Sequence, residues 1–434
     1  RSAVSNVHIP ESPWFSYRDG TLVCEDVALE SIANEVDTPA FVYSGAAIDD
    51  AYRSIDDALA FAPHLIAYAV KANGNLSVLA RLAAQGCGAD IVSVGEMQRA
   101  LKAGFPPDRI VYSGVGKRRE EILAAAEAGI RALHVENIQE LDVIESVAQE
   151  LGRPLAIGLR VNPDVDAETH PYIATGLRES KFGLAIPVAE SIVPRVLRSP
   201  HLELEAVACH IGSQLSSPRP LREAVEILGA FAVHCIDRGA KLRAIDVGGG
   251  WPMHYGQEID AYPPAAQFGE AIREGLDASG MLRPEVEIIT EPGRALVGDA
   301  GVLLTRVLYT KMQADRRFVI VDAAMTELIR PALYGAYHAI MPIAEPDPRA
   351  DLVSVDVVGP VCESGDFVAK DRPLPEVNPG DLLAIRGAGA YGREMQSMYN
   401  ARPLPPEVLV DGSRSRLVRR RSGPEALWQG EILA

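Results

Sequence analysis

Short apolar runs recur along the middle of the chain, and segments of helical periodicity separate them. Each run is too short for a helix and ends near a turn residue, which predicts a strand. Eight such runs follow one another: Leu65–Val70, Ala89–Val94, Arg109–Ser113, Ala132–Glu136, Ala156–Val161, Ala206–His210, Ala244–Val247 and Val286–Thr290. The segments between them, such as Leu76–Gln85 and Asn137–Glu150, carry apolar residues three and four positions apart, which predicts helices.

Eight strand–helix units in succession predict a (β/α)8 TIM-like barrel, an α/β fold. An open, doubly wound sheet remains the alternative, because alternation alone does not report closure. The barrel also predicts where chemistry gathers, since the active sites of this fold lie at the carboxyl ends of its strands. Unusual polar residues fall at those ends, beginning with Lys71 after the first strand and Asp90 in the second.

The pattern changes after about residue 295, where strands alternate with Pro-rich loops. This texture predicts a β-rich second domain over residues 295–434, next to a barrel over 46–294. Residues 1–45 also contain strand-like pieces, and we expect them to pair with the β-domain. The expected strands are Leu22–Cys24, Ala40–Ser44, Gly301–Tyr309, Arg317–Val321, Leu352–Val358 and Asp381–Ile385.

The composition suits a globular protein with a large core, since 47% of the residues are hydrophobic and 23% are charged. Against 42 Lys and Arg stand 59 Asp and Glu, which gives a net charge of −17. We therefore expect no binding to nucleic acid or to anionic membranes, because phosphate groups require clustered positive charge. The one basic run, Arg416–Arg421, is interpreted as a solvated feature near the C-terminus.

No apolar run approaches the ~18 residues of a membrane-spanning helix, and no N-terminal segment has the pattern of a signal peptide. The five cysteines show no metal-binding spacing, so we expect free thiols in a reducing compartment and no metal. These features predict a soluble, cytoplasmic protein. The chain begins with Arg1 rather than Met, which fits processing, trimming or excision from a longer product.

Lys71 ends the first apolar strand and is the first candidate for chemistry. Desolvation at this place would favour its neutral amine, which is the form that attacks a carbonyl. The competing interpretation is a lysine whose stem packs at the barrel rim while its amine reaches water. The pattern alone leaves both open.

Other candidates follow the later strands. Gly248-Gly249-Gly250 follows the seventh strand, where barrels commonly bind phosphate and where absent side chains let backbone N–H groups approach an anion. Glu291 and Arg294 follow the eighth strand and offer a carboxylate and a guanidinium, although a structural ion pair fits equally well. His210 follows the sixth strand and is either a packed histidine or a ligand contact.

The second domain offers further candidates at three places. Arg330 and Tyr334 stand one helical turn apart and could hold a carboxylate together. Cys362 and Glu363 lie in a turn, where the thiol is either reactive or an inert buried cysteine. Tyr391 lies among glycines that would let the backbone bring its phenol to a phosphate.

Taken in order, the motifs resemble those of the bacterial diaminopimelate decarboxylases, a family in the alanine-racemase-like group of enzymes that use pyridoxal 5′-phosphate (PLP). The resemblance covers about residues 20–415. Its motifs are Tyr-Ala-Val-Lys71-Ala-Asn, Ser180-Lys-Phe-Gly183, His210-Ile-Gly-Ser-Gln214, Asp246-Val-Gly-Gly-Gly250, Glu291-Pro-Gly-Arg294, Ile329-Arg-Pro-Ala-Leu-Tyr334, Cys362-Glu-Ser-Gly-Asp366 and Gly389-Ala-Tyr391.

The resemblance implies a barrel plus a β-domain and a cofactor site in the barrel. Lys71 corresponds to the lysine that forms a Schiff base with PLP, Glu291 to the acid at the pyridine nitrogen, and His210 to the residue stacked on the ring. Ser213, the glycine triplet and Tyr391 correspond to positions at the phosphate. The full set expected at the cofactor is Lys71, Asp90, His210, Ser213, Gly248, Gly249, Gly250, Glu291, Pro292, Gly293, Arg294 and Tyr391.

The resemblance also implies decarboxylation of meso-2,6-diaminopimelate to L-lysine, with Arg294, Arg330, Tyr334 and Tyr391 as substrate contacts. Glu363 corresponds to the acid at the distal amino group. Cys362 corresponds to the thiol that protonates the intermediate, supplied by the neighbouring subunit of a head-to-tail homodimer. An ionised Glu291 would keep the pyridine ring protonated and able to take up electrons, whereas racemases of the group resemble one another in having arginine there.

This interpretation has three alternatives. A sister decarboxylase would act on ornithine, arginine, carboxynorspermidine or a carrier-bound amino acid. A non-catalytic PLP carrier would need only Lys71 and the phosphate loop, and the candidates of the second domain argue against it. A barrel hydrolase lacks support, because the sequence has no nucleophile-elbow motif and no metal-ligand cluster.

Overall fold

The computed structural model describes residues 12–167, 180–257 and 262–434, and its contacts divide the chain into two units. The first comprises Arg1–Asp50, Met253–Ala261 and Leu296–Ala434, and the second comprises Ala51–Pro252 and Tyr262–Ala295. Two of the boundaries fall within helices α2 (Gly45–Leu59) and α10 (Arg294–Val297). The second unit contains parallel strands with intervening helices, and the first contains the β-rich sheets.

The described strands of the second unit include eight parallel ones that close into a barrel. They neighbour one another in the order β9, β11, β12, β13, β5, β6, β7, β8, and β8 pairs back with β9. The short β10 (Leu184–Ala185) extends the edge of β9. The barrel strands are β5 (His64–Ala69), β6 (Gly88–Ile91), β7 (Ile110–Tyr112), β8 (Ala132–Val135), β9 (Leu155–Asn162), β11 (Leu202–Ala208), β12 (Ala244–Asp246) and β13 (Glu287–Thr290). Closure confirms the predicted barrel and excludes the open sheet.

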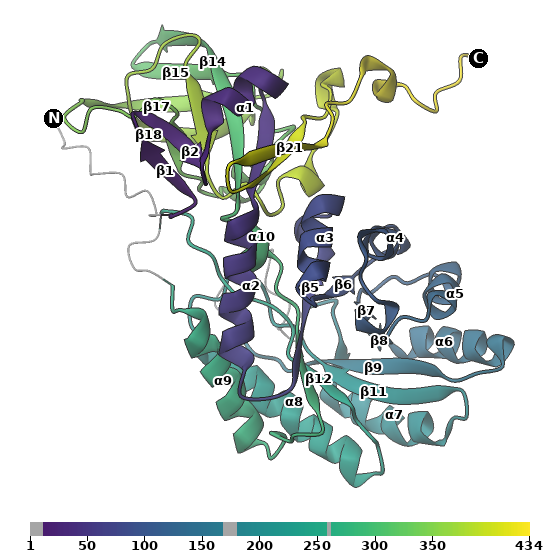
Figure 1. Ribbon diagram of the computed structural model, residues 1–434. Helices are drawn as coiled ribbons and strands as arrows, with labels where there is room; N and C mark the ends of the chain where they lie inside the picture. Colours follow the sequence, from purple (N-terminus) through teal and green to yellow (C-terminus); the bar gives the residue numbers. More distant parts are fainter. Residues whose placement is uncertain (1–11, 168–179, 258–261) are drawn as a thin grey trace. The chain divides into compact units, whose positions relative to one another are not determined.

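Helices surround these strands (Figure 1), and local chemistry sets their ends. The side chains of Ser93 and Asn137 accept N–H groups of the first turns of α4 and α6, as N-caps do. Gly104 and Gly152 end the same helices in the left-handed conformation that glycine adopts without strain. The helices are α3 (Leu76–Ala84), α4 (Val94–Ala103), α5 (Arg119–Ala128), α6 (Ile138–Leu151), α7 (Ile186–Arg198), α8 (Arg219–Asp237) and α9 (Ala265–Ala278).

The barrel encloses an apolar cluster and, separately, a polar group of side chains. Small and branched residues from several strands form the apolar cluster: Leu65, Ala67, Val111, Ala206, Ala244 and Ile289. His134 on β8 and Asp246 on β12 are buried polar residues. Gly158 on β9 makes room for the imidazole, because a Cβ there would lie 2.6 Å from Cδ2 of His134. The fold therefore keeps space for a buried polar cluster inside the barrel.

The first unit is built around a long strand that joins several partners. β14 (Gly301–Gln313) pairs antiparallel with β4 (Ala40–Ser44), β15 (Arg316–Val321) and β19 (Leu382–Ile385). The main path runs β18-β17-β15-β14-β4-β20-β21, with β16 (Ile340–Pro342) on β19. The remaining strands of this sheet are β17 (Leu352–Val358), β18 (Phe367–Pro375), β20 (Glu407–Asp411) and β21 (Arg414–Arg419). β4 thus lies in the same sheet as strands from the C-terminal part.

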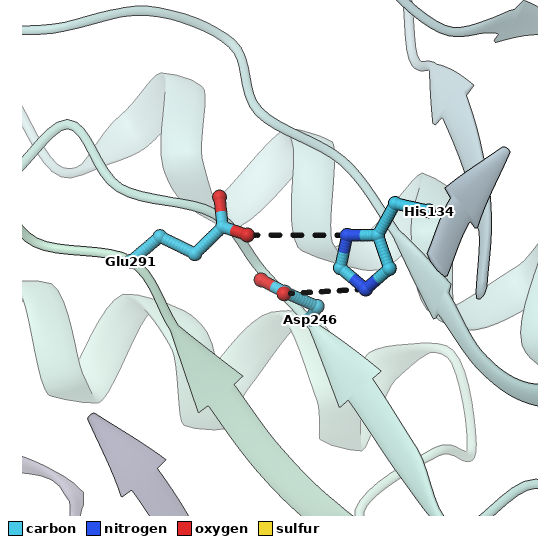
Figure 2. Close-up of side chains that lie close together, drawn as sticks. All are labelled: His134, Asp246 and Glu291. Carbon is cyan, nitrogen blue, oxygen red and sulfur yellow. Dashed lines mark ion pairs between the residues drawn. The ribbon is translucent and has the colours of Figure 1, made fainter. Parts of the chain in front are cut away.

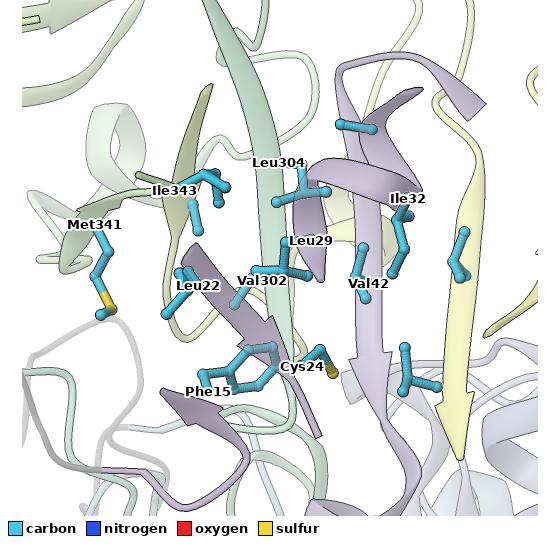
Figure 3. Close-up of a cluster of buried hydrophobic side chains, with 14 residues drawn as sticks. Phe15, Leu22, Cys24, Leu29, Ile32, Val42, Val302, Leu304, Met341 and Ile343 are labelled. Carbon is cyan, nitrogen blue, oxygen red and sulfur yellow. The ribbon is translucent and has the colours of Figure 1, made fainter. Parts of the chain in front are cut away.

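A separate meander packs with this sheet into one apolar core. β1 (Phe15–Arg18), β2 (Thr21–Cys24) and β3 (Val27–Ala28) form a three-stranded sheet that leads into α1 (Leu29–Val36). Their side chains, among them Leu22 and Leu29, meet Val302 and Leu304 of β14 in a fully buried cluster (Figure 3). Burial of this apolar surface ties the N-terminal segment to strands that lie more than 250 positions later.

The interpretation of the basic run as a solvated feature holds for Arg416 and Arg420, which are exposed, and is wrong for Arg419 and Arg421. Arg416 to Arg419 belong to β21, which pairs with β20 in an antiparallel hairpin. Nη1 of Arg419 donates to Oε1 of the buried Glu407 at 3.0 Å, and Nη2 of Arg421 donates to two backbone carbonyls. Arg419 and Arg421 are therefore structural partners. None of the helices in the described ranges is long and apolar enough to cross a membrane.

Candidate active site

Lys71 follows β5 in the short turn Val70–Ala72, and its amine faces a buried carboxylate. Nζ of Lys71 lies 3.7 Å from Oδ2 of Asp90 on β6; the Lys71 side chain is 41% exposed and that of Asp90 is 1% exposed. Burial raises the pKa of Asp90, and the positive charge of Lys71 opposes this rise. Oδ1 of Asp90 meets no hydrogen-bond partner in the described part of the chain. The lysine amine is therefore accessible at the strand end, while its counter-ion is buried.

The glycine triplet follows β12 and is required for a close approach of backbones. A Cβ on Gly248 would collide with the carbonyl of Cys209, and a Cβ on Gly249 would collide with the carbonyl of Glu291. Gly248 has φ of +73° and Gly250 has φ of +99°, which a residue with a side chain adopts only with strain. No bulkier residue fits this turn without a shift of the backbone.

Two N–H groups of the triplet are already bonded to side chains. Gly248 N–H donates to Oδ1 of Asp246 at 2.9 Å, and Gly249 N–H donates to Nδ1 of His210 at 3.1 Å. The second bond places the proton of the neutral His210 ring on Nε2, and burial lowers the pKa of this imidazole well below its usual value. Within the described residues, the N–H of Gly250 thus has no such side-chain bond and can donate to an anion.

The turn Glu291-Pro292-Gly293-Arg294 follows β13 and lies beside the strand end that carries Lys71, since the carbonyl of Pro292 accepts the N–H of Ala69 at 3.0 Å. Arg294 is 5% exposed, and its Nε and Nη2 donate to Oγ of Ser213 at 3.3 and 3.1 Å. Because this hydroxyl oxygen accepts two N–H groups, its own hydrogen is directed elsewhere. Arg294 and Ser213 together therefore suit an anion.

Glu291, Asp246 and His134 come from different strands and face one another inside the barrel (Figure 2). Nδ1 of His134 lies 4.0 Å from Oε1 of Glu291, and its Nε2 lies 3.9 Å from Oδ2 of Asp246. Ser113 after β7 completes the group, because its hydroxyl lies 3.2 Å from Nδ1 of His134 and donates to Glu291 at 3.4 Å. The cluster thus surrounds the carboxylate of Glu291 with polar neighbours.

The protonation of this cluster follows from its burial. Burial and the nearby carboxylates of Asp246 and Asp90 raise the pKa of Glu291 well above its usual value. Burial raises the pKa of Asp246 to about 7. Burial, with the positive charges of Lys117 and other basic residues, lowers the pKa of His134 to about 3. Near neutral pH the imidazole is uncharged, and the two carboxyl groups compete for a proton.

The same three residues offer nitrogen and oxygen atoms within 4.8 Å of one another, which invites a comparison with a metal centre. A metal ion needs its ligands at about 2.0–2.2 Å from a common point. The Asp246 and Glu291 carboxyl groups instead lie close enough to hydrogen bond with each other once one is protonated. We therefore interpret the cluster as a group that shares a proton.

A second buried pair lies at the ends of β8 and β9. Nη1 of Arg160 donates to Oε1 of Glu136 at 2.6 Å, and both side chains are buried. Glu136 also accepts the N–H groups of Gly114 and Gly183, at 2.8 and 3.2 Å. The Arg160 guanidinium stacks 5.2 Å from the ring centre of Phe182. This pair fixes the segment that carries Phe182 and Gly183 to the end of the barrel.

In the first unit, Arg330 belongs to a buried cationic cluster. Its Nη1 donates to Nε2 of His338 at 3.0 Å, and its guanidinium lies 4.9 Å from the ring centre of Tyr255. Nδ1 of His338 donates to the carbonyl of Arg386 at 2.8 Å, which fixes the tautomer that accepts from Arg330. Tyr334 is half-buried at the other end of α11 (Arg330–Tyr334). Arg330 is thus held in place and is not an exposed surface residue.

Cys362 and Glu363 lie in the turn between β17 and β18. Cys362 is exposed, in contrast with the buried Cys24, Cys87, Cys209 and Cys235. Its N–H donates to Oδ1 of Asn400 at 3.0 Å, and Oε2 of Glu363 accepts the hydroxyl of Tyr399 at 3.2 Å. Exposure excludes the inert buried cysteine and leaves the thiol accessible for proton transfer.

Tyr391 follows a glycine-rich segment and has φ of +55°. A Cβ on Gly389 would collide with the carbonyl of Val297, and the N–H of Ala388 donates to the carbonyl of Gly301 at 2.9 Å. These glycines therefore let their segment pack closely against the backbone just before and at the start of β14. Tyr391 is half-buried at the end of this segment.

The structure thus brings the barrel candidates to one end of the barrel and adds residues that the sequence did not single out. His134, Ser113 and Glu136 belong to this group, and so do His338 and Tyr255 in the first unit. Ser113 and Glu136 are polar residues at the ends of apolar runs, and His134 interrupts one. Barrel closure and not sequence spacing makes these three residues neighbours.

Comparison with known proteins gives a consistent result. The model of the pyridoxal-binding domain of pyridoxal-dependent decarboxylases matches residues 46–298. A diaminopimelate decarboxylase of Pseudomonas aeruginosa is 49% identical over 422 residues, which are 96% of this chain and 99% of that protein. The structure of Helicobacter pylori diaminopimelate decarboxylase complexed with L-lysine is 44% identical, with a TM-score of 0.87 over 92% of this chain and 98% of that one. The M. jannaschii enzyme in co-complex with L-lysine is 34% identical, with a TM-score of 0.91 over 97% and 98%. This chain therefore belongs to the diaminopimelate decarboxylases, a family of pyridoxal-dependent decarboxylases.

Proposed function

We propose that this protein is a carboxy-lyase that uses PLP to convert meso-2,6-diaminopimelate to L-lysine and carbon dioxide, the last step of lysine biosynthesis. The observation that carries the proposal is the arrangement at the barrel end, where an accessible lysine amine, a glycine turn and a buried glutamate occupy neighbouring strand ends. The near full-length similarity to diaminopimelate decarboxylases supports this substrate over those of sister enzymes.

The residues of the barrel fit PLP on three structural grounds. The glycine turn has space only for backbone, and among the described residues it leaves the N–H of Gly250 for an anion. The bonded pair Arg294–Ser213 lies at the same end of the barrel. Oδ1 of Asp90 is a buried polar atom without a partner among the described residues, close to the Lys71 amine. Glu291 is a buried carboxyl group whose ionised form requires a positive neighbour.

Each residue then has a role at a stated atom. We assign Nζ of Lys71 to the cofactor aldehyde, with Asp90 beside it, and the Glu291 carboxylate to the ring nitrogen. His210 is assigned to the ring face, and Gly248, Gly249, Gly250, Ser213 and Tyr391 to the phosphate group, together with the turn Pro292–Arg294. When bound, PLP supplies an electron sink for the pair left on the α-carbon after carbon dioxide departs.

The remaining assignments concern the substrate. Arg294, Arg330 and Tyr334 supply positive charge and hydrogen bonds to carboxylates, and Tyr391 adds a phenol. Glu363 supplies a negative charge for the distal amino group. Cys362 donates its Sγ proton to the α-carbon, and its exposure supports this role because the thiolate that remains needs a polar environment. A substrate charged at both ends therefore suits this set.

We further propose a homodimer in which the neighbouring subunit supplies Cys362, and domains over residues 1–45, 46–294 and 295–434. Two inactive variants test the shared site, because in a symmetric dimer each site would draw on both chains. A mixture of Lys71→Ala and Cys362→Ala proteins is expected to regain about one quarter of the wild-type activity on subunit exchange. A mixture that stays inactive, while labelled subunits exchange, would contradict the shared site.

The substrate is tested by measuring carbon dioxide release from meso-diaminopimelate, ornithine, arginine and carboxynorspermidine by the PLP-loaded protein. We expect release from meso-diaminopimelate and the appearance of L-lysine. Release from another amino acid of the panel alone would identify a sister decarboxylase. PLP uptake that shifts the visible spectrum, without release from any of them, would favour the carrier.

A further inference from the structure

Asp246 joins the glycine turn to Glu291. Its Oδ1 accepts the N–H of Gly248 at 2.9 Å, and the carbonyl of the same glycine accepts the N–H of Glu291 at 2.7 Å. The hydroxyl of Thr290 donates to this carbonyl as well, at 2.8 Å. Both the N–H and the carbonyl of Gly248 are therefore hydrogen bonded, and the bond of the N–H depends on Asp246.

The second oxygen of Asp246 lacks a partner unless a proton is present. Oδ2 of Asp246 and Nε2 of His134 are both buried without a hydrogen-bond partner among the described residues, and they lie 3.9 Å apart. The Glu291 carboxyl group lies within hydrogen-bonding reach of Asp246. Two ionised carboxylates offer only acceptors, whereas a single proton between them forms one hydrogen bond and removes the repulsion.

We propose that Asp246 is a positioning residue that works in its protonated form, donating Oδ2–H to the Glu291 carboxylate while Oδ1 anchors Gly248. This inference rests on the proposed function, because a positively charged ring nitrogen facing Glu291 draws the negative charge onto Glu291 and leaves the proton on Asp246. The proton stays within the pair, and none passes to the substrate. Glu291 is then fixed from two sides, by Asp246 and by the hydroxyl of Ser113 at 3.4 Å.

Some charged or titratable neighbours of the Asp246–Glu291 pair raise the pKa values of its carboxyl groups, and others lower them. Asp90 and Cys209 disfavour a second negative charge, whereas Lys71 and Arg160 favour it. His134 stays uncharged and gives Asp246 no cation to pair with. Burial raises the pKa of Asp246 to about 7, although the hydrogen bond with Glu291 lowers it, and the pKa of Glu291 is raised well above its usual value. Without the cofactor the proton therefore rests on Glu291, and the positive ring nitrogen is what moves it to Asp246. These neighbours come from five strands or strand ends: Lys71, Asp90, His134, Arg160 and Cys209.

The test compares Asp246→Ala with Asp246→Asn. Alanine removes both hydrogen bonds, whereas the carboxamide keeps an oxygen for Gly248 and permanently offers N–H to Glu291. We expect Asp246→Ala to weaken PLP affinity and to lower kcat by about 10- to 100-fold each, the cost of lost hydrogen bonds to a charged group. Asp246→Asn should recover most of both losses. PLP affinity is read from titration of the visible absorbance, and Asp277→Asn on the outer helix α9 is the matched surface control.

An infrared measurement tests the proton directly. The wild-type minus Asp246→Asn difference spectrum should show the carbonyl band of a protonated carboxyl group near neutral pH in the PLP-loaded protein, and Asp277→Asn should leave that band in place. An Asp246→Asn protein as impaired as Asp246→Ala, or a missing band, would overturn the inference by showing that the ionised form is needed. A wild type that takes up no PLP would instead refute the proposed function, and the band of the protein alone would still report whether the pair holds a proton.

Discussion

The two units of this chain differ in how their buried carboxylates are hydrogen bonded. In the first unit, buried carboxylates are surrounded by donors. Glu25 accepts the hydroxyl of Ser44 at 2.6 Å and also the N–H of Gly412, and Glu407 accepts Nε of Arg393 at 2.9 Å. The Gly412–Glu25 bond joins residues 387 positions apart, and the other two bonds join residues 14 and 19 positions apart, so these hydrogen bonds hold separate segments of the first unit together.

In the barrel, buried charge is left partly unsatisfied. Among the described residues, Asp90, His134 and Asp246 each keep a buried polar atom without a partner. The unpartnered atoms of the first unit lie on Thr21, Arg386 and Gln396, none of which is a carboxylate or an imidazole. Unsatisfied buried groups cost stability, and native proteins keep them chiefly where function needs them. We therefore infer that the buried carboxylates of Glu25 and Glu407 serve stability, whereas those of Asp90 and Asp246 in the barrel are kept for chemistry.

The strongest test of this comparison is Lys71→Ala. We expect decarboxylation to fall by at least about 10⁴-fold, because the amine that we assign to the cofactor aldehyde is lost. The melting temperature should change little by comparison, since Lys71 is 41% exposed and contributes little packing. Carbon dioxide release and thermal unfolding of the same preparation check both statements. Activity near the wild-type level would remove Lys71 from the chemistry.

The barrel acids should also make stability depend on pH. Asp246 has its pKa raised from 3.8 to about 7, so its contribution to stability is present below about pH 4 and is lost as the pH rises through 7. This shift corresponds to a loss on the order of 4 kcal/mol. His134 has the opposite effect on stability, because its pKa is lowered from 6.5 to about 3. Its contribution to stability is present above pH 6.5 and is lost as the pH falls toward 3.

The difference between wild type and Asp246→Asn isolates the Asp246 contribution from that of His134. Urea unfolding of the protein without PLP should show Asp246→Asn gaining stability relative to wild type as the pH rises from 4 to 8. A difference that does not change with pH would show that the Asp246 carboxyl group is not perturbed by burial.

Glu407→Ala tests whether a buried carboxylate of the first unit serves stability. Glu407 is fully buried, and its removal leaves Arg393 paired with Glu394 alone and takes the acceptor from the buried hydroxyl of Tyr43. We expect a loss of about 3 kcal/mol in the free energy of unfolding, because buried donors, one of them charged, lose their acceptor. Turnover per folded molecule should stay within about twofold. Urea unfolding and carbon dioxide release measure the two effects, with the exposed Glu431→Ala as the control.

Glu291→Gln removes one negative charge from the barrel cluster without changing its shape. We expect kcat to fall by about 100-fold, because in the proposed role of Glu291 the amide would no longer stabilise a positive charge at the ring nitrogen. PLP affinity should fall less, since the proposed phosphate contacts are elsewhere in the site. Steady-state kinetics and PLP titration separate the two quantities. Unchanged turnover would show that Glu291 is a structural acid, as the acids of the first unit are.

The same contrast explains what the sequence could and could not predict. All eight barrel strands were predictable, because strands buried on both faces read as continuous apolar runs between glycines. β18 was missed because it contains Pro373 and Pro375, which are unusual in strands. The residues at strand ends stood out as polar interruptions. Their neighbours did not, because His134 and Asp246 meet only through closure of the barrel, which depends on register and not on spacing.

Arg419→Ala gives the smallest expected effect and tests the corrected interpretation of the basic run. Arg419 donates to the buried Glu407 at 3.0 Å, whereas Arg420 is exposed. We expect Arg419→Ala to lower the free energy of unfolding by about 1 kcal/mol, since Arg393 still pairs with Glu407. Arg420→Ala should change it by less than about 0.5 kcal/mol. Equal effects in urea unfolding would mean that both arginines act through net charge alone, and the basic strand would then not be part of the first unit's charge pairing.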